Sequence, residues 1–384
     1  MKSVNLSENF SIFINLLKTT MGCGILKYPT LYYEYGIIPA LILTVISAFA
    51  SYCGIFLYID LNDKYGLGNT LSTVSLHFAP YLKVLADIVV IAKCYMVGVA
   101  YLIYIGEQLV FLLKYFMIDL SPKIALGIVL ALISPFIFIS KIDKLKYTST
   151  AGLVAILMLV SASYYRLKSN EIPHSISYDT GNRSYIKNLC HFVFSFTCHQ
   201  NIFTLQNSME NYNKRHLKIT SGFSFVSAVV IYSIFGWISY IALGNNLKTS
   251  YLEAQPEDHL KVAISIFYIC LVSLSIPLQT NPCKSYLLNA VNPDFLVKES
   301  YFYVRTGFSL FLTLSIYIFA ICGINFDKIC GFVGGTFSTF MCFIFAAVYH
   351  FLSFGIFKNI LNTVLAIIAM TYGVLSFTAV LLAK

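Results

Sequence analysis

Two glycines interrupt the first apolar segment of the chain and expose backbone groups in its middle. Residues 15–29 read NLLKTTMGCGILKYP, with Gly22, Cys23 and Gly24 at the centre. At bilayer depth, unpaired backbone N–H and C=O groups are tolerated only where the backbone lines a protein cavity. The half-helix after Gly24 begins with free N–H groups that suit a carboxylate, and the half-helix before Gly22 ends with free carbonyls that suit an ammonium group. The break therefore predicts a site for the headgroup of an α-amino acid.

A second segment carries a matching interruption. Residues 194–203 read FSFTCHQNIF and place five polar or weakly polar residues in an otherwise apolar stretch. At that depth such residues are costly unless they face a cavity or hydrogen-bond between helices, and both interpretations stay open. The predicted donors are the N–H groups of Cys23, Gly24 and Ile25. The predicted acceptors and lining residues are Thr20, Met21, Phe196, Thr197, Cys198 and His199.

Ionisable and aromatic residues flank the two interruptions. Lys18 lies one helical turn before Gly22 and on the same face, so its ammonium would replace a coupling cation or carry a proton. The alternative is that Lys18 extends to the membrane surface. Tyr101 is expected to cover the ligand carboxylate, and Gly98 to open space on the face of Tyr101. The alternative is that Tyr101 only fills the core of the helix bundle. His199 is a second candidate proton carrier.

Two more ionisable residues lie in the third apolar segment. Lys93 and Glu107 are too far apart in sequence to pair on one helix, so each needs a partner from another segment.

Composition sets the class of the protein. The 384 residues are 58% hydrophobic and 11% charged, whereas about 25% of residues are charged in a soluble domain. This indicates a polytopic membrane protein with the bilayer as its partner. The net charge of +9 comes from scattered Lys and Arg residues, which argues against nucleic acid. The ten cysteines include no CxxC pair, so neither a disulfide framework, a metal site nor a cofactor is expected. No catalytic cluster surrounds His191 or His199, which argues against an enzyme.

Apolar windows predict an all-α protein with about eleven membrane spans. The spans are 10–33, 37–60, 84–113, 124–140, 148–165, 187–209, 218–243, 260–281, 302–322, 328–352 and 359–383. Spans six to ten start about 180 residues after spans one to five, which predicts two repeats, 10–165 and 187–352, of opposite orientation with the site between them. The last span, 359–383, is extra. Helices one and six should be broken.

Loop charges predict the orientation of the chain. Basic residues occur at 141–146 and 214–218, while acidic residues occur at 253–258. Because basic loops stay on the cytoplasmic side, the amino terminus is expected there and the carboxyl terminus on the other side. The sequence does not distinguish the plasma membrane from a vacuolar or lysosomal membrane, and it leaves the oligomeric state open.

At these motifs the chain resembles the amino acid/auxin permease family, from about residue 10 to 380. The matching segments are NLLKTTMGCGILKYP, GVAYLIYIG at 98–106, FSFTCHQNIF followed by Met209 and Glu210, SIPLQTNPCKSYL at 275–287 and GFVGGTFSTFMCFIFAAVYHF at 331–351. The resemblance implies a LeuT-like inverted repeat of five plus five helices with one extra helix. It also implies an amino acid substrate between spans one, three, six, eight and ten.

The same resemblance bears on the coupling ion. Sodium-coupled members carry asparagine at the position of Lys18, whereas proton-coupled and vacuolar members more often carry lysine. Ser273 and Ser275 fall where sodium-coupled members have ion-coordinating hydroxyls, which keeps a sodium site open. The expected function is a proton-coupled amino acid transporter that works by alternating access. The alternatives are a sodium symporter, an uncoupled facilitator and a transporter-like amino acid sensor.

Overall fold

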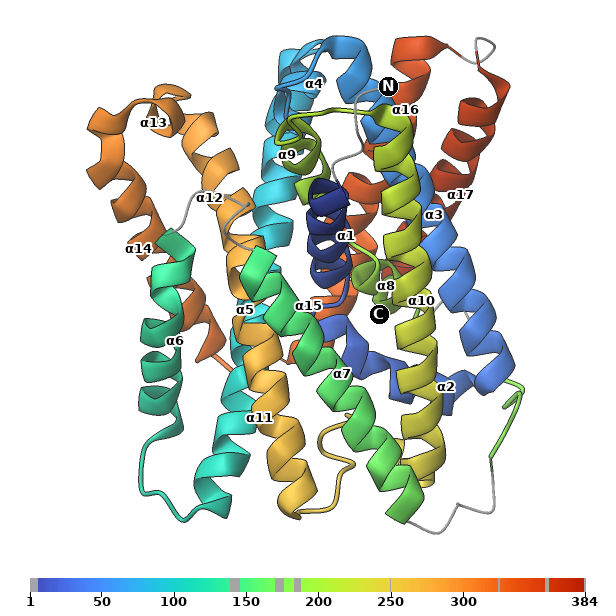
Figure 1. The fold of residues 1–384 in the computed structure, drawn as a ribbon, viewed down its shortest axis with the longest axis vertical. Coiled ribbons are helices and arrows are strands. Elements are labelled where there is room, and N and C mark those ends of the chain that lie inside the picture. The colour runs from blue at the N-terminus through green and yellow to red at the C-terminus, as the bar shows by residue number, and fades with distance from the viewer. Residues whose placement is uncertain are drawn as a thin grey trace.

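The computed structural model of the chain describes residues 6–138, 146–169, 176–182, 188–248, 250–323, 325–355 and 359–382. The regular structure in these ranges is helical, and no strand occurs in them. Most helices run along the long axis of the molecule and pack side by side (Figure 1). The predicted all-helical architecture is therefore confirmed. Part of the basic loop at 141–146, which supports the predicted orientation, lies outside the described residues.

Helices occupy the predicted ranges in both halves of the chain. The first half contains α1 (Leu6–Thr20), η1 (Cys23–Lys27), α2 (Tyr28–Tyr35), α3 (Ile37–Tyr65), α4 (Leu71–Leu76), α5 (Pro80–Tyr115), α6 (Pro122–Phe138) and α7 (Lys146–Ser169). The second contains α8 (Leu189–Ser195), η3 (His199–Asn201), α9 (Ile202–Asn207), α10 (Lys214–Leu243), η4 (Gly244–Lys248), α11 (His259–Ser273), α12 (Ile276–Val291), α13 (Asp294–Val297), η5 (Glu299–Tyr301), α14 (Phe302–Ala320), α15 (Phe326–Val333), η6 (Gly334–Ser338), η7 (Phe340–Ile344), α16 (Phe345–Phe354) and α17 (Ile360–Leu382). Each half begins with a broken helix, as predicted. The repeat boundaries themselves stay a prediction.

Three features depart from the predicted spans. The eighth span is longer than 260–281, because α12 continues to Val291, and it is interrupted at Leu274 and Ser275. The tenth span contains two π-helical turns, η6 and η7. Such turns occur frequently at functional sites. A short helix, α4, lies in the connection before α5.

Eight helical segments of the described chain are long and apolar enough to cross a membrane. Large apolar side chains also cover their outer surfaces. On α3, Ile38, Ile42, Val45 and Phe49 are each about half exposed and recur every three or four residues. Apolar stripes of this kind on a folded chain indicate contact with lipid. The protein is therefore a multi-pass membrane protein.

The helices form two packed groups around the breaks. In one group α10 packs extensively against α1, α2 and α3, and in the other α5 packs against α11, α12 and α14. Helix α7 contacts α1, α10 and α11, so it joins the groups. The α1 break lies between the two groups, because Tyr232 of α10 contacts Thr20 and Tyr101 of α5 contacts Gly22.

A tight turn directs α3 back through the bundle. Gly36 has a φ of +86°, and a Cβ there would lie 2.7 Å from the carbonyl oxygen of Tyr178. Only glycine adopts this conformation readily and leaves space for the neighbouring loop. The turn therefore fixes the direction in which α2 leads into α3.

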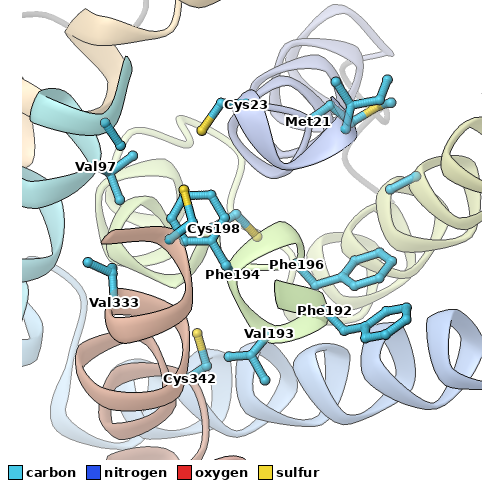
Figure 2. Packing of buried hydrophobic residues seen from close by; sticks show 14 of the residues in the cluster. Met21, Cys23, Val97, Phe192, Val193, Phe194, Phe196, Cys198, Val333 and Cys342 are labelled. Carbon is cyan, nitrogen blue, oxygen red and sulfur yellow. The ribbon is translucent and has the colours of Figure 1, made fainter. Parts of the chain in front are cut away.

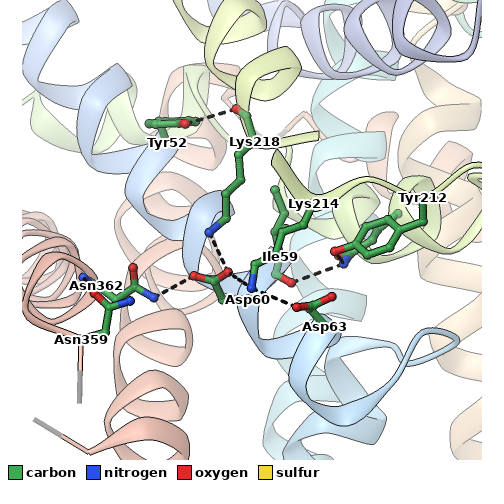
Figure 3. A network of polar contacts seen from close by, with 10 residues as sticks. Tyr52, Ile59, Asp60, Asp63, Tyr212, Lys214, Lys218, Asn359 and Asn362 are labelled. Atoms are coloured by element: carbon green, nitrogen blue, oxygen red, sulfur yellow. Dashed lines mark hydrogen bonds and ion pairs between the residues drawn. The ribbon is translucent and has the colours of Figure 1, made fainter. Parts of the chain in front are cut away.

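A charged network ties one end of α3 to α10 and α17 (Figure 3). Asp60 is only 4% exposed and lies 2.6 Å from the ammonium of Lys218 and 2.7 Å from that of Lys214. Its second oxygen accepts a hydrogen bond of 2.8 Å from Asn362 on α17. Because this buried carboxylate is paired on both oxygens, it links three helices at one end of the bundle.

Candidate functional site

The first break has the geometry of two half-helices that meet at Gly22. Helix α1 ends at Thr20, and the short helix η1 starts at Cys23. The N–H of Gly22 donates to the carbonyl of Thr20 at 3.0 Å, and the N–H of Ile25 donates to the carbonyl of Gly22 at 3.5 Å. Ile25 is thus not a free donor, contrary to the prediction. Cys23 and Gly24 remain as the first amide groups of η1, which have no acceptor within their own helix.

The second break crosses the first. Helix α8 ends at Ser195, and residues 196–198 are non-helical before η3 begins. A Cβ on Gly24 would lie 2.6 Å from Ser195 Oγ and 3.0 Å from its Cα, so only glycine allows this approach. Figure 2 shows Cys23 and Cys198, one from each break, near Val97 of α5. The two breaks therefore form one site in the middle of the bundle.

Tyr232 of α10 occupies part of the predicted ammonium site. Its hydroxyl lies 2.8 Å from the carbonyl oxygen of Thr20 and 3.0 Å from that of Ser195. The Thr20 carbonyl also accepts from the N–H of Gly22, so the prediction that it is free is wrong. The sequence could not indicate this partner, because α10 meets the breaks only in the folded chain. The carbonyls of Met21, Phe196 and Thr197 are the predicted acceptors that remain.

The side chains at the second break face different neighbours. The ring of Phe196 packs against Phe225 and Tyr232 on α10, so the ring points away from the first break. The hydroxyl of Thr197 donates to the carbonyl of Val193 within α8. Both side chains are therefore engaged within the protein, and the predicted ligand groups at this break are the backbone carbonyls.

Lys18 is buried and held by the interruption in the eighth span. Its side chain is 0% exposed, and its Nζ donates to the Leu271 carbonyl at 3.0 Å and to the hydroxyl of Ser275. This contact excludes extension to the membrane surface. Gly152 of α7 makes room for it, because a Cβ there would overlap the Lys18 side chain. Ser273, the other predicted hydroxyl, is not among the hydrogen-bond partners of Lys18 in the described chain and is partly exposed.

Tyr101 lies against the first break. Its side chain is 2% exposed, and its hydroxyl occupies the space that a Cβ on Gly22 would need. The expectation for Gly98 is wrong: this glycine faces Ile316 of α14, where a Cβ would lie 3.1 Å from Cδ1. Tyr101 is therefore placed to touch a ligand bound at Gly22, and Gly98 serves helix packing.

His199 is turned away from the first break. Its Nε2 lies 2.9 Å from the carbonyl oxygen of Ser51 on α3 and must donate to it, because a carbonyl only accepts. The ring packs between Tyr58 and Phe343. The position of His199 in the break predicted that it lines the site, but the rotation of this segment directs its side chain toward α3 and η7.

A buried polar network that the sequence did not connect lies beside the breaks. Lys93 of α5 donates to Gln279 Oε1 on α12 at 2.8 Å, and Gln200 of η3 donates to the same oxygen at 3.3 Å. All three side chains are at most 4% exposed. The sequence indicated only that Lys93 needs a partner. No group of three His, Cys, Asp or Glu residues in the described chain has the arrangement of a metal site.

A polar vestibule leads toward the first break from the α2 end of the bundle. This cavity of about 400 Å³ is lined by Glu34, Glu107, Glu253 and Asp327, together with Lys27. Lys27 pairs with Asp327 at 3.0 Å. Beneath the vestibule, the rings of Tyr104, Tyr268 and Phe326 pack edge to face. The cavity thus has an acidic lining, to which Tyr104 and Phe326 add two aromatic rings.

The whole length of the chain matches one family of proteins. The family described as "Transmembrane amino acid transporter protein" matches residues 7–383. The chain belongs to this family. The predicted resemblance to the amino acid/auxin permeases is thereby confirmed, and the transporter is not an enzyme.

Individual relatives support amino acid transport as the function of the transporter. "Vacuolar amino acid transporter 5" of Schizosaccharomyces pombe is 28% identical over 370 residues, which cover 90% of this chain and 84% of the relative. "Vacuolar amino acid transporter 5" of Saccharomyces cerevisiae is 26% identical, with 72% of this chain and 66% of the relative covered. "Solute carrier family 38 member 8" of Mus musculus is 25% identical, with 78% and 71% covered.

A solved structure shares the fold of the transporter. MhsT in complex with L-phenylalanine superposes with a TM-score of 0.66 at 10% sequence identity, and the match covers 98% of each chain. At this identity the likeness concerns the fold alone. The transporter thus has the LeuT-like fold that the sequence predicts.

Proposed function

We propose that the transporter is a proton-coupled symporter of amino acids that works by alternating access. The α-carboxylate binds the N–H groups of Cys23 and Gly24, and the α-ammonium binds the carbonyls of Met21, Phe196 and Thr197. Tyr101 closes over the carboxylate. This assignment is supported by the crossing of the two breaks and by the Tyr101 hydroxyl beside Gly22.

The position of Lys18 is the observation that carries proton coupling. Its ammonium donates to the Leu271 carbonyl and the Ser275 hydroxyl, so these two oxygens are not available as ligands to a sodium ion. A lysine buried among neutral groups exchanges its proton more readily than an exposed one. We therefore assign the role of proton carrier to Lys18. The contact joins α1 to α11 and α12, so loss of the proton would loosen the two helix groups from each other.

The membrane and orientation are part of the proposal. The two yeast relatives are named vacuolar, which supports an acidic intracellular compartment, with the plasma membrane as the alternative. The amino terminus is then cytoplasmic and the acidic vestibule opens to the lumen. A fluorescent fusion viewed beside a vacuolar marker tests the compartment.

Uptake into proteoliposomes tests the proposed function. Labelled amino acids are supplied under an imposed pH gradient, an imposed sodium gradient or neither. We expect accumulation under the pH gradient alone. Accumulation under sodium alone would contradict the role of Lys18, and uptake that only equilibrates under every gradient would establish a facilitator. The absence of any flux or exchange would refute transport and favour a sensor.

A further inference from the structure

Two buried ammonium groups beside the breaks have no carboxylate partner among the described residues. Lys18 is 0% exposed and Lys93 is 1% exposed. Their acceptors, Ser275 and Gln279, are four residues apart on one helix, which corresponds to about 6 Å along its axis. The ion pairs of the described chain include neither lysine. A buried charge without a counter-charge is unfavourable, so this region lacks negative charge.

Lys93 has the less complete environment of the two. In the described chain its ammonium donates to the neutral amide oxygen of Gln279, which Gln200 shares, whereas an ammonium group offers three donors. Within the described chain, one further polar atom beside Gln279 is buried without a partner: Gln200 Oε1. Unpartnered buried polar atoms are rare in folded proteins, and this one belongs to the side chain that shares Gln279 with Lys93. The arrangement is that of a polar subsite without its ligand.

The subsite adjoins the proposed headgroup site. Tyr101 touches Gly22 at the first break, and its hydroxyl also lies beside the side chain of Gln279. Lys93 precedes Tyr101 by two turns of α5 and donates to the same Gln279. A ligand with its α-carboxylate at Gly22 would therefore extend its side chain along Tyr101 toward Lys93.

We propose that Lys93, with Gln279, binds the side-chain carboxylate of a dicarboxylic amino acid. The α-carboxylate and α-ammonium of any amino acid cancel each other and leave Lys93 without a counter-charge. A second carboxylate on the substrate supplies that charge and accepts the remaining N–H donors of Lys93. A neutral amide side chain can accept a hydrogen bond but does not neutralise the ammonium. This assignment rests on the proposed function, because it requires the headgroup site at the breaks.

Competition in proteoliposomes tests the subsite in the full-length protein. The probe is uptake of a labelled neutral amino acid that the wild-type protein transports, inhibited by unlabelled glutamate, aspartate or glutamine at fixed pH. For wild type we expect glutamate or aspartate to inhibit at lower concentration than glutamine. In Lys93→Gln the ratio of the glutamate to the glutamine inhibition constant should rise at least tenfold.

Two further variants keep the test independent of folding defects. Gln279→Glu puts a carboxylate of the protein beside the Lys93 ammonium. It should therefore also raise the ratio of the glutamate to the glutamine inhibition constant at least tenfold. Lys284→Gln is the matched control: this buried lysine donates to the Ile137 carbonyl at 3.0 Å, toward α6. The control should keep the wild-type ratio.

The outcomes separate the subsite from the proposed function. If wild type carries amino acids but glutamate and aspartate do not compete, the subsite is refuted and the proposed function stands. If glutamate competes equally well against wild type, Lys93→Gln and Gln279→Glu, dicarboxylic amino acids bind elsewhere and the proposal is also refuted. If wild type moves no amino acid at all, the proposed function fails, and the subsite fails with it.

Discussion

Replacing Lys18 with methionine should uncouple transport from the proton gradient without unfolding the protein. Methionine keeps most of the volume of the lysine side chain but has no charge and no donor. Both acceptors remain paired after the substitution, because Ser275 Oγ itself donates to the Leu271 carbonyl at 2.7 Å. The substitution therefore leaves no new unsatisfied oxygen in the bundle.

The two energetic effects of this substitution oppose each other. A hydrogen bond from a charged donor contributes about 1.5 to 3 kcal/mol, while burial of the ammonium costs several kcal/mol. The net change in unfolding free energy should stay within about 1 kcal/mol, since replacement of buried charges by apolar groups is often neutral or stabilising. The thermal unfolding midpoint in detergent should therefore remain within a few degrees of wild type.

The effect on accumulation is large by comparison. One pH unit corresponds to about 1.4 kcal/mol per proton, so a one-proton symporter can concentrate its substrate roughly tenfold across a gradient of one unit. Lys18→Met should equilibrate its substrate instead, with an accumulation ratio near one. The assay is steady-state uptake into proteoliposomes with the membrane potential clamped, and Lys284→Met serves as the control. Tenfold accumulation by Lys18→Met would refute the assignment of the proton to Lys18.

Three other substitutions test separate parts of the structure. Gly22→Ala places a methyl group against the Tyr101 hydroxyl, an overpacking that costs about 1 to 3 kcal/mol, and should reduce uptake at least fivefold. Adding Tyr101→Phe to this variant removes the hydroxyl and should restore part of the uptake. Absence of this rescue would argue against a steric clash. Tyr232→Phe removes the donor to two helix-end carbonyls and should lower stability by about 1 to 3 kcal/mol, seen as a lower unfolding midpoint in detergent; an unchanged midpoint would mean that water replaces the hydroxyl. In the loop before α11, hydrogen bonds from Arg166 lower the pKa of Asp258 to about 2, compared with about 3.8 in the unfolded chain. The ionised pair therefore stabilises the fold fully above pH 3.8, and this stabilisation is lost as the pH falls toward 2. Asp258→Asn should lower the unfolding midpoint equally at pH 4.5 and pH 7.5, and a deficit only at the higher pH would contradict this.

The parts of the fold that depend on local sequence could be predicted. Apolar length and flanking charges located the spans, because a membrane requires about twenty apolar residues per helix. The glycines at 22 and 24 located the first break, since few other residues permit it. The interruption at Leu274 and Ser275 was missed because it contains no glycine and follows an uninterrupted apolar run.

The direction of each side chain at the site could not be predicted. Gly98 and His199 were placed correctly along their helices, but the rotation of a helix depends on packing against distant segments. Tyr232 lies more than two hundred residues from Thr20 in sequence and still donates to its carbonyl. Lys93 and Gln279 likewise meet only in the folded bundle. A single sequence does not show which residues from distant segments will contact each other.

The acidic vestibule gives the transporter an electrical asymmetry. Four carboxylates and one ammonium line this cavity, so a substrate with net negative charge is repelled from it. The repulsion lowers the concentration of such a substrate at the opening and therefore slows its entry from the vestibule side. Because ions screen charges over roughly 8 Å at physiological ionic strength, this slowing of entry should weaken as salt is added on that side. A basic substrate would experience the opposite bias through the same opening.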